Sequence, residues 1–208
     1  IVIILDIETV AAPPGDPAVV AYLAKHPDRA DALALSPWTG RVACVAVLDT
    51  EAQSHQAKWC GYLQSAPASE EYTPEEWNLE AVAHEDAILR EAWHHIRGKQ
   101  VCTWNGVSFD VPFLVGRSLV NGVKVDRSLL DAKPWETRHL DLMTKLGRAS
   151  SLDVCACAMG LPSPKSDLSG PEVGAAWARG EFLRVAEYCA RDVDTLHEIY
   201  KRWREVTT

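Results

Sequence analysis

The chain has 208 residues, 47% of them hydrophobic and 24% charged, which is typical of a soluble globular domain with a substantial core. No apolar run approaches the roughly 20 residues that a membrane span needs, and a net charge of −8 argues against a protein that coats nucleic acid without specificity. Six cysteines lack any C-x-x-C pair, which favours free thiols in a reducing compartment. We therefore expect one cytoplasmic domain over residues 1–208, with no membrane partner.

The chain begins with a strand signal that ends in two acids. Five apolar residues, Ile1–Leu5, predict a strand buried on both faces. Asp6 and Glu8 follow at the carboxyl end of this strand, and residues two apart on a strand point to the same side. Two adjacent carboxylates raise each other's pKa unless a cation lies between them, and such oxygen ligands suit Mg²⁺ or Mn²⁺. The alternative is a strand that runs into a solvated acidic turn, and the rest of the chain has to decide between them.

The next part of the chain predicts a helix, a β-hairpin and a second helix. Asp16-Pro17 is typical of a helix start, because Asp caps the helix and Pro suits its first position. Along the first hairpin strand, strict alternation would place Val42, Cys44 and Ala46 on one face. The expected elements are a helix over 17–25, an irregular segment to Gly40, strands over 41–48 and 56–63, a loop over 65–80, and a helix over 84–97.

The second half predicts one more strand and then mostly helix: a strand over 100–104, a helix over 111–120 capped by Asp110, short pieces over 123–150, and helices over 151–159, 170–180 and 181–205. The order indicates an α/β fold with a mixed central sheet flanked by helices. A right-handed crossover would bring strand 100–104 parallel to the first strand, so that Asp6, Glu8 and Asp110 converge on one sheet edge.

The last helix supplies a fourth acid. Tyr188 and Asp192 are four residues apart and share a helical face, where Asp192 interrupts an otherwise apolar stripe. An unpaired buried charge is too costly, so Asp192 needs a partner. Taken alone, it would be a surface acid paired with Arg191 or Lys201. Taken with the acids of the first strand and with Asp110, it predicts a group of four carboxylates.

These motifs resemble the DEDD superfamily of 3′–5′ exonucleases, which has an RNase H-like fold. The family motifs correspond to Asp6-Ile7-Glu8 on the first strand, to Asn105 followed by Phe109-Asp110, and to Tyr188 four residues before Asp192 on a late helix. Position 187 is Glu, so the Tyr variant (DEDDy) is indicated. The sequence of residues 105–114, NGVSFDVPFL, most resembles those of proofreading domains of family-B DNA polymerases and their stand-alone relatives.

The resemblance implies hydrolysis of phosphodiester bonds with two divalent cations, Mg²⁺ or Mn²⁺, roughly 3.5–4 Å apart. Asp6 would bridge both cations, Glu8 and Asp192 would hold the one that activates water, and Asp110 would hold the other through water. Tyr188 would orient the attacking water. Nucleoside 5′-monophosphates would be released from the 3′ end of single-stranded nucleic acid, with DNA favoured over RNA.

The resemblance also implies substrate contacts. Thr9 and Val10 would touch the terminal nucleotide, and Asn105 and Phe109 the next sugar and base, although core packing explains Phe109 equally well. Asp141 is more simply a structural turn acid than a site residue, and Asp194 a solvated helix acid. The segment 165–167 lies in the net positive stretch 111–169 and would meet the substrate backbone or form a mobile surface loop.

Three other functions are open at this point. One is a catalytically inactive module on the same fold that binds nucleic acid or docks a protein, which the intact set of acids disfavours. The others are an exonuclease directed at RNA and an endonuclease, and the Tyr188–Asp192 pair argues against the endonuclease. A polymerase or another replication or repair protein is a possible partner, because proofreading would have to act in trans or within a longer protein.

Overall fold

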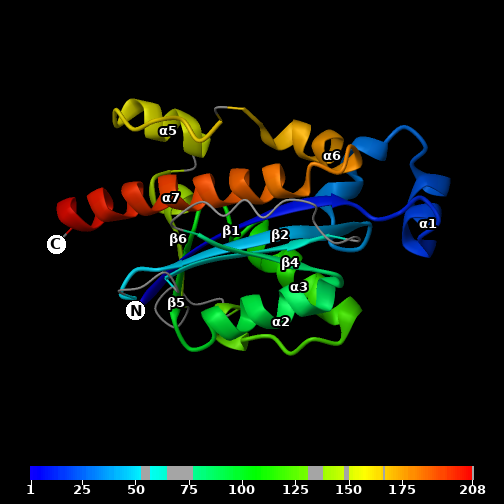
Figure 1. Ribbon diagram of the computed structural model, residues 1–208, viewed down its shortest axis with the longest axis horizontal. Helices are drawn as coiled ribbons and strands as arrows, with labels where there is room; N and C mark the ends of the chain where they lie inside the picture. Colours follow the sequence, from blue (N-terminus) through cyan, green and yellow to red (C-terminus); the bar gives the residue numbers. More distant parts are fainter. Residues whose placement is uncertain (53–56, 65–76, 131–137, 148–149, 166, 208) are drawn as a thin grey trace.

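The computed structural model describes residues 1–52, 57–64, 77–130, 138–147, 150–165 and 167–207. They fold into a six-stranded sheet in the order β4-β3-β2-β1-β5-β6, with helices on both faces (Figure 1). The strands are β1 Val2–Ala11, β2 Gly40–Asp49, β3 Lys58–Leu63, β4 Asn78–Val82, β5 Gln100–Thr103 and β6 His139–Asp141. The helices are α1 Pro17–Lys25, η1 Ala30–Leu35, α2 Glu85–Ile96, α3 Asp110–Asn121, η3 Arg127–Leu129, α4 Leu142–Lys145, α5 Leu152–Ala158, α6 Gly170–Ala178 and α7 Phe182–Val206.

The predicted α/β fold with a mixed sheet is confirmed, and its arrangement is that of an RNase H-like exonuclease fold. β1 lies at the centre, antiparallel to β2 and parallel to β5. The helix α2 provides the crossover that brings β5 beside β1, as the order of elements predicts. β2 and β3 pair antiparallel, so the predicted hairpin pairing is also confirmed, although residues 53–56 between them lie outside the described part.

Two apolar layers form because the side chains of β1 alternate between the two faces of the sheet. The odd residues Ile3, Leu5 and Ile7 pack against α2 and α3. The even residues Val2, Ile4 and Val10 belong to the layer beneath α5, α6 and α7. Asp6 and Glu8 are the two even positions left over, so the same alternation points both acids toward the α7 side.

Two expectations about the central strands are wrong. The first strand continues through both acids to Ala11, because it stays paired with β2 as far as Gly40, so Asp6 and Glu8 lie inside the strand. The register between β1 and β2 shifts at Glu8 and Thr9, where Ala43 is an extra residue on β2. This bulge breaks the alternation of β2, so Val42 joins the layer of α2 and α3 while Cys44 and Ala46 face α7.

Two short edge strands replace segments predicted to be irregular. Residues 78–80 of the predicted loop belong to β4, which pairs parallel to β3; residues 65–76 of that loop lie outside the described part. β6 pairs parallel to β5 within the stretch predicted to hold only short pieces. At the start of α3, Phe109 takes the cap position and Asp110 is the first helical residue, so the helix begins one residue earlier than predicted.

A buried ion pair joins α2, α3 and β2. Glu85 accepts hydrogen bonds from Arg117 Nε at 2.8 Å and Nη2 at 2.6 Å, and from the Val42 amide at 2.8 Å. Arg117 also donates to the Pro37 carbonyl at 2.9 Å, which ties the segment before β2 to α3. Each charge therefore has several partners, which an ion pair needs once it leaves water.

None of the described helices combines the length and the apolar character that a membrane crossing requires.

Candidate active site

Three carboxylates from the two ends of the chain meet above the centre of the sheet. Asp6 and Glu8 on β1 and Asp192 on α7 each offer an oxygen atom, and these atoms all lie within 4.8 Å of one another. Asp6 and Glu8 are partly exposed, whereas Asp192 is 8% exposed. Oxygen ligands at this spacing could hold a divalent cation such as Mg²⁺ or Mn²⁺.

Asp110 joins this group because β5 is short. β5 pairs with Val2–Ile4 only and ends at Thr103, so the next part of the β1 edge is free for the loop that follows β5. That loop delivers Asp110 to the first turn of α3, and its carboxylate accepts hydrogen bonds from its own amide and from the Ile7 amide. An acid at a helix N-terminus is also favoured by the helix dipole.

On α7, Tyr188 and Asp192 lie on the same helical face, as their spacing predicts, and they interact with each other. The Tyr188 hydroxyl donates a hydrogen bond to the Asp192 carboxylate. Arg191 and Lys201 were the cations expected to pair with Asp192 if it were an ordinary surface acid. Arg191 instead pairs with Asp167, and Lys201 pairs with Glu198 at 2.6 Å.

Burial raises the pKa of every acid in the group, and repulsion from neighbouring acids raises the pKa of Asp6, Glu8 and Asp110 further. Burial is the first cause for Asp6, whose pKa is well above its usual range, and Asp110, Asp192 and Glu8 raise it further. Glu8 shifts in the same direction for the same reasons. Burial raises the pKa of Asp110 to about 7 and that of Asp192 to about 6. A bound cation would relieve this repulsion, so the donor set fits a metal.

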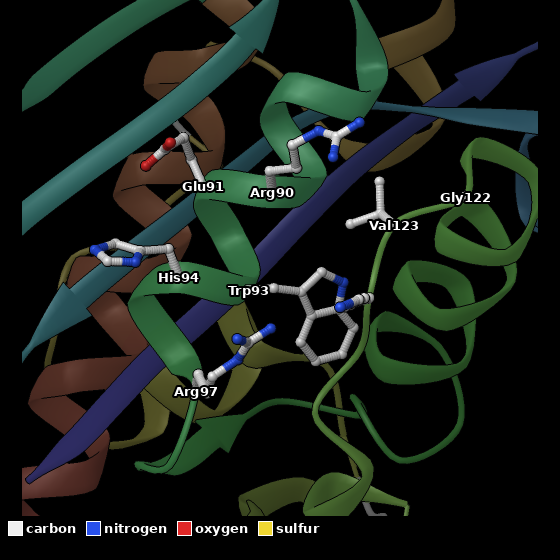
Figure 2. Close-up of a pocket in the computed structure, with 8 residues that line it drawn as sticks. Arg90, Glu91, Trp93, His94, Arg97, Gly122 and Val123 are labelled. Carbon is white, nitrogen blue, oxygen red and sulfur yellow. The ribbon is translucent and has the colours of Figure 1, made fainter.

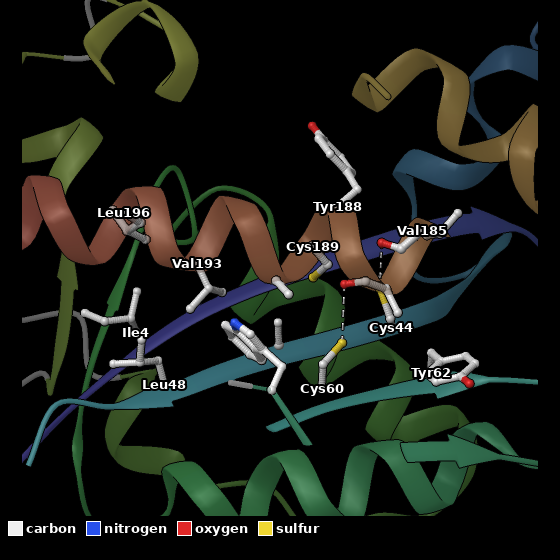
Figure 3. Packing of buried hydrophobic residues seen from close by; sticks show 14 of the residues in the cluster. Ile4, Cys44, Leu48, Cys60, Tyr62, Val185, Tyr188, Cys189, Val193 and Leu196 are labelled. Carbon is white, nitrogen blue, oxygen red and sulfur yellow. Dashed lines mark hydrogen bonds between the residues drawn. The ribbon is translucent and has the colours of Figure 1, made fainter. Parts of the chain in front are cut away.

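Burial and the nearby acids also raise the pKa of Tyr188 far above its ordinary value, so its hydroxyl stays protonated. Tyr188 points away from the sheet, whereas Cys189 points toward it, in a layer with Cys44 and Cys60 (Figure 3). The Cys189 thiol lies 3.5 Å from Asp6 Oδ2, so the buried layer between α7 and the sheet contacts the acids directly.

A cleft of about 490 Å³ opens beside the acids. Asp6, Tyr188 and Asp192 line one side of it. The remaining lining comes from the chain after β5 and from the segment around α5: Trp104, Asn105, Met143, Ser150, Ser151, Leu152, Asp153 and Lys165. A cleft of this volume is in the range that holds a small ligand, and its lining offers both apolar surfaces and a cation.

The four residues predicted to contact substrate are placed differently. Asn105 lines the cleft. Phe109 is partly buried and its ring lies 5.5 Å from that of Phe113. The Thr9 hydroxyl donates to the Ala34 carbonyl at 2.7 Å, and the Val10 side chain lies in the core at 4% exposure. For Thr9 and Val10, a substrate contact would therefore have to come mainly from the backbone.

Trp104 is a cleft residue that sequence reasoning missed. Its indole N–H is buried and has no hydrogen-bond partner among the described residues. The only signal was its place directly before Asn105, since eight scattered tryptophans gave no pattern. Lys165, predicted to meet substrate or to lie on a surface loop, lines the cleft and pairs with Asp153 at 2.9 Å.

Asp194 is not the simple solvated acid that was expected. It accepts a hydrogen bond from Trp77 Nε1 at 3.0 Å and pairs with Lys58 at 3.0 Å. It therefore links α7 to β3 and to the segment before β4, on a different side of α7 from Asp192.

A second pocket, of about 410 Å³, lies away from the acids. Figure 2 shows Arg90 on α2 and Arg97 directly after it on either side of Trp93, with Val123 on the chain that follows α3. Arg97 and Lys124 lie just after the C-terminal ends of α2 and α3, where cations offset the negative end of the helix dipole, whereas Arg90 lies mid-helix and pairs with Asp86. This pocket shares no lining residue with the cleft.

Comparisons with known proteins bear on the same region. A family model described as "Predicted 3'-5' exonuclease related to the exonuclease domain of PolB" matches residues 65–208, which include Asn105, Asp110, Tyr188 and Asp192. A DNA polymerase of Pyrococcus glycovorans is 27% identical over 142 residues. That match covers 58% of this chain and 18% of the polymerase, so the chain corresponds to a small part of that relative.

Proposed function

The chain belongs to the family of predicted 3′–5′ exonucleases related to the exonuclease domain of PolB, and from this premise we propose that it hydrolyses single-stranded DNA from the 3′ end. The products would be nucleoside 5′-monophosphates. The observation that carries the proposal is the meeting of Asp6, Glu8 and Asp192 within 4.8 Å, with Asp110 and Tyr188 beside them. We propose DNA instead of RNA as the substrate because a similar protein is a DNA polymerase.

The acids would hold two divalent cations. Asp6, Glu8 and Asp192 would hold one cation, and Asp6 with Asp110 would hold the other. Cations in such a site neutralise charge on the phosphate and lower the pKa of a water molecule that attacks phosphorus. The chain's own part is to supply carboxylate oxygens at a fixed spacing. The raised pKa values support this, because they come from burial first and from repulsion between the acids second, and a cation would offset both.

Tyr188 and the cleft supply the remaining functions. A hydroxyl that stays protonated can donate one hydrogen bond and accept another, so Tyr188 would orient the attacking water while it donates to Asp192. The cleft would hold the terminal nucleotides. Trp104 offers an aromatic surface for a base, and Lys165 offers positive charge for a phosphate. These roles support the proposal that the chain is of the Tyr variant of the DEDD superfamily.

A DNA polymerase, or another replication or repair protein, would be the natural partner of such an activity. The chain corresponds to only part of a DNA polymerase. Proofreading would therefore act either in trans or within a longer protein. A reducing cytoplasm suits the cysteines, all six of which are free thiols.

The proposal is tested with single-stranded DNA and RNA oligonucleotides labelled at the 3′ or the 5′ end, in Mg²⁺, Mn²⁺ or EDTA. We expect a ladder that shortens from the 3′ end, that requires a divalent metal, and that is absent in Asp6→Ala and Asp192→Ala. Both variants should remain folded, because each removes a charge that its neighbours repel.

Asp194→Ala is the matched control for Asp192→Ala. It removes an acid from the same helix that contacts Lys58 and Trp77 instead of the other acids. Its hydrolysis rate should stay within about twofold of wild type. Near wild-type activity in Asp6→Ala or Asp192→Ala would refute the site. Failure to cut either polymer, with binding retained, would favour the inactive binding module.

A further inference from the structure

The loop that joins β5 to α3, residues 104–109, holds an unusual backbone conformation. Asn105 has φ 69°, and it is the one non-glycine residue with positive φ in the part of the chain that the structure describes. Such conformations persist only where the surroundings fix them, and they cluster at functional sites. The loop carries Asn105 to the wall of the cleft and ends at Asp110, so its path decides where both lie.

Asp141, at the end of β6, holds this loop from below. Its Oδ1 accepts a hydrogen bond from the Asn105 amide at 3.1 Å, and its Oδ2 accepts one from the Val107 amide at 3.0 Å. Oδ1 also accepts the Thr144 amide at 3.1 Å, which caps α4. The cap requires only this last bond. The other two cross to a segment more than 30 residues earlier in the chain, and Asp141 is 3% exposed, so water competes little for them.

Between these two amides, Gly106 is held by Thr103. The Gly106 amide donates to Thr103 Oγ1 at 3.2 Å, and that oxygen lies 2.8 Å from His139 Nε2 on β6. A Cβ atom at position 106 would lie 2.3 Å from Thr103 Oγ1, so only glycine fits. Three consecutive loop amides are therefore bound by side chains at the ends of β5 and β6.

We propose that Asp141 is a positioning residue of the exonuclease site. Its carboxylate fixes the loop 104–109, and through the loop it places Asn105 against the substrate strand and Asp110 beside Asp6. The inference rests on the proposed function. Asp141 does not itself contact substrate, because three backbone amides occupy its two oxygens.

The test is Asp141→Asn, which keeps the shape of the side chain. One carboxylate oxygen becomes an NH₂ group, so an amide that pointed at an acceptor now faces a donor. The matched control is Asp126→Asn. Asp126 also accepts hydrogen bonds from two backbone amides, but it lies away from the cleft. Its donors are the Gly98 amide at 2.9 Å and the Ser128 amide at 3.0 Å.

Two measurements are made on both variants and on wild type. The first is kcat and KM on a 3′-labelled DNA strand, where Asp141→Asn should lose about tenfold or more in kcat/KM because the reacting groups are misplaced. Asp126→Asn should stay within about twofold. The second is amide hydrogen exchange, which should speed up about tenfold or more at residues 104–109 in Asp141→Asn alone.

A folded Asp141→Asn with kcat/KM and loop exchange like those of Asp126→Asn would overturn the inference. If Asp141→Asn does not fold, Gly106→Ala displaces the same loop from the Thr103 side and must show the same loss of kcat/KM, or the inference is overturned. A wild-type protein that cuts neither polymer would overturn the proposed function. An active wild type with an unaffected loop variant would overturn only this inference.

Discussion

At Asp192 the chain places a carboxyl group where ionisation is costly. Its pKa rises from an ordinary 3.8 to about 6, first because of burial, while the Tyr188 hydrogen bond and the nearby Lys165 lower it. A group whose folded pKa lies above its unfolded pKa binds protons more tightly in the folded state. Stability is therefore lost as pH rises from about 4 through the folded pKa. Asp6, Glu8 and Asp110 shift in the same direction, so their effects reinforce one another.

The first prediction concerns Asp192→Asn in EDTA. Removing this charge should raise the melting temperature by about 5 °C at pH 8, from a gain of about 2 kcal/mol. At pH 5 the gain should be smaller, because the folded carboxyl is already largely protonated there. Thermal unfolding followed by circular dichroism at the two pH values measures this. Asp194→Asn should instead lower the melting temperature slightly at both, and equal behaviour of the two variants would contradict the argument.

The second prediction concerns Tyr188→Phe, which removes only the hydroxyl. We expect kcat to fall about tenfold or more with KM little changed, because in the proposed mechanism the hydroxyl would orient the attacking water without binding the strand. Steady-state kinetics at several pH values measures both constants. Tyr200→Phe is the control, since Tyr200 lies on the same helix but its ring stacks on Trp203. A loss confined to KM would place the Tyr188 hydroxyl on the substrate instead.

Among the elements, α2 and α3 depend on the Glu85–Arg117 pair. The two side chains are 8% and 7% exposed, so each is a buried charge whose partner cannot be replaced by water. The pair also holds the Pro37 carbonyl and the Val42 amide at the start of β2. The side of the sheet away from the cleft is therefore fixed by polar bonds as well as by apolar packing.

The third prediction compares neighbouring acids on α2. Glu85→Ala should lower the free energy of unfolding by about 3–5 kcal/mol, because Arg117 is left buried without its carboxylate. Asp86→Ala should change the free energy of unfolding little, because Asp86 pairs with Arg90 at the surface, where water screens the two charges. Urea unfolding measures both changes. A similar small loss in the two variants would mean that Arg117 finds another partner or water.

Among the elements, the long and periodic segments could be predicted from the sequence, whereas the edge strands of the sheet could not. β1, β2 and α7 have strong apolar patterns that local sequence specifies. β4 and β6 are short edge strands that pair with β3 and β5, so their pairing is decided by tertiary contacts. The bulge at Ala43 follows from the register with β1, which no single strand reveals.

The same distinction applies to the candidate site. Asp6 and Glu8 could be placed on one side of a strand, and Tyr188 and Asp192 on one face of a helix, because fixed periods govern both. Trp104 and the bonds of Asp141 lay beyond such reasoning, since they depend on where a loop passes over β5 and β6.

For the molecule as a whole, the proposed metal site should make the free energy of unfolding depend on divalent cations. A cation that binds only the folded state stabilises it, by about 2.7 kcal/mol at a concentration one hundred times its Kd. The fourth prediction is that saturating Mn²⁺ or Mg²⁺ raises the melting temperature by about 5–10 °C at pH 8. The increase should be smaller at pH 5, where protons occupy the acids.

Calorimetry with and without EDTA measures this difference, and Asp6→Asn provides the control. That variant removes an acid common to both ligand sets, so most of the metal-dependent increase should disappear. An increase that survives in Asp6→Asn would mean that the stabilising ion binds elsewhere on this acidic protein.

The acids come from the first strand, from the middle of the chain and from the last long helix, and a ribosome makes these parts in that order. Until α7 has been made and has packed onto the sheet, Asp6 and Glu8 lack Asp192 and Tyr188. A growing chain would therefore lack the α7 residues of the proposed site and would have no activity. In the proposed mechanism cleavage would begin only when α7 docks, so a product truncated before residue 188 would leave the nucleic acid around it uncut.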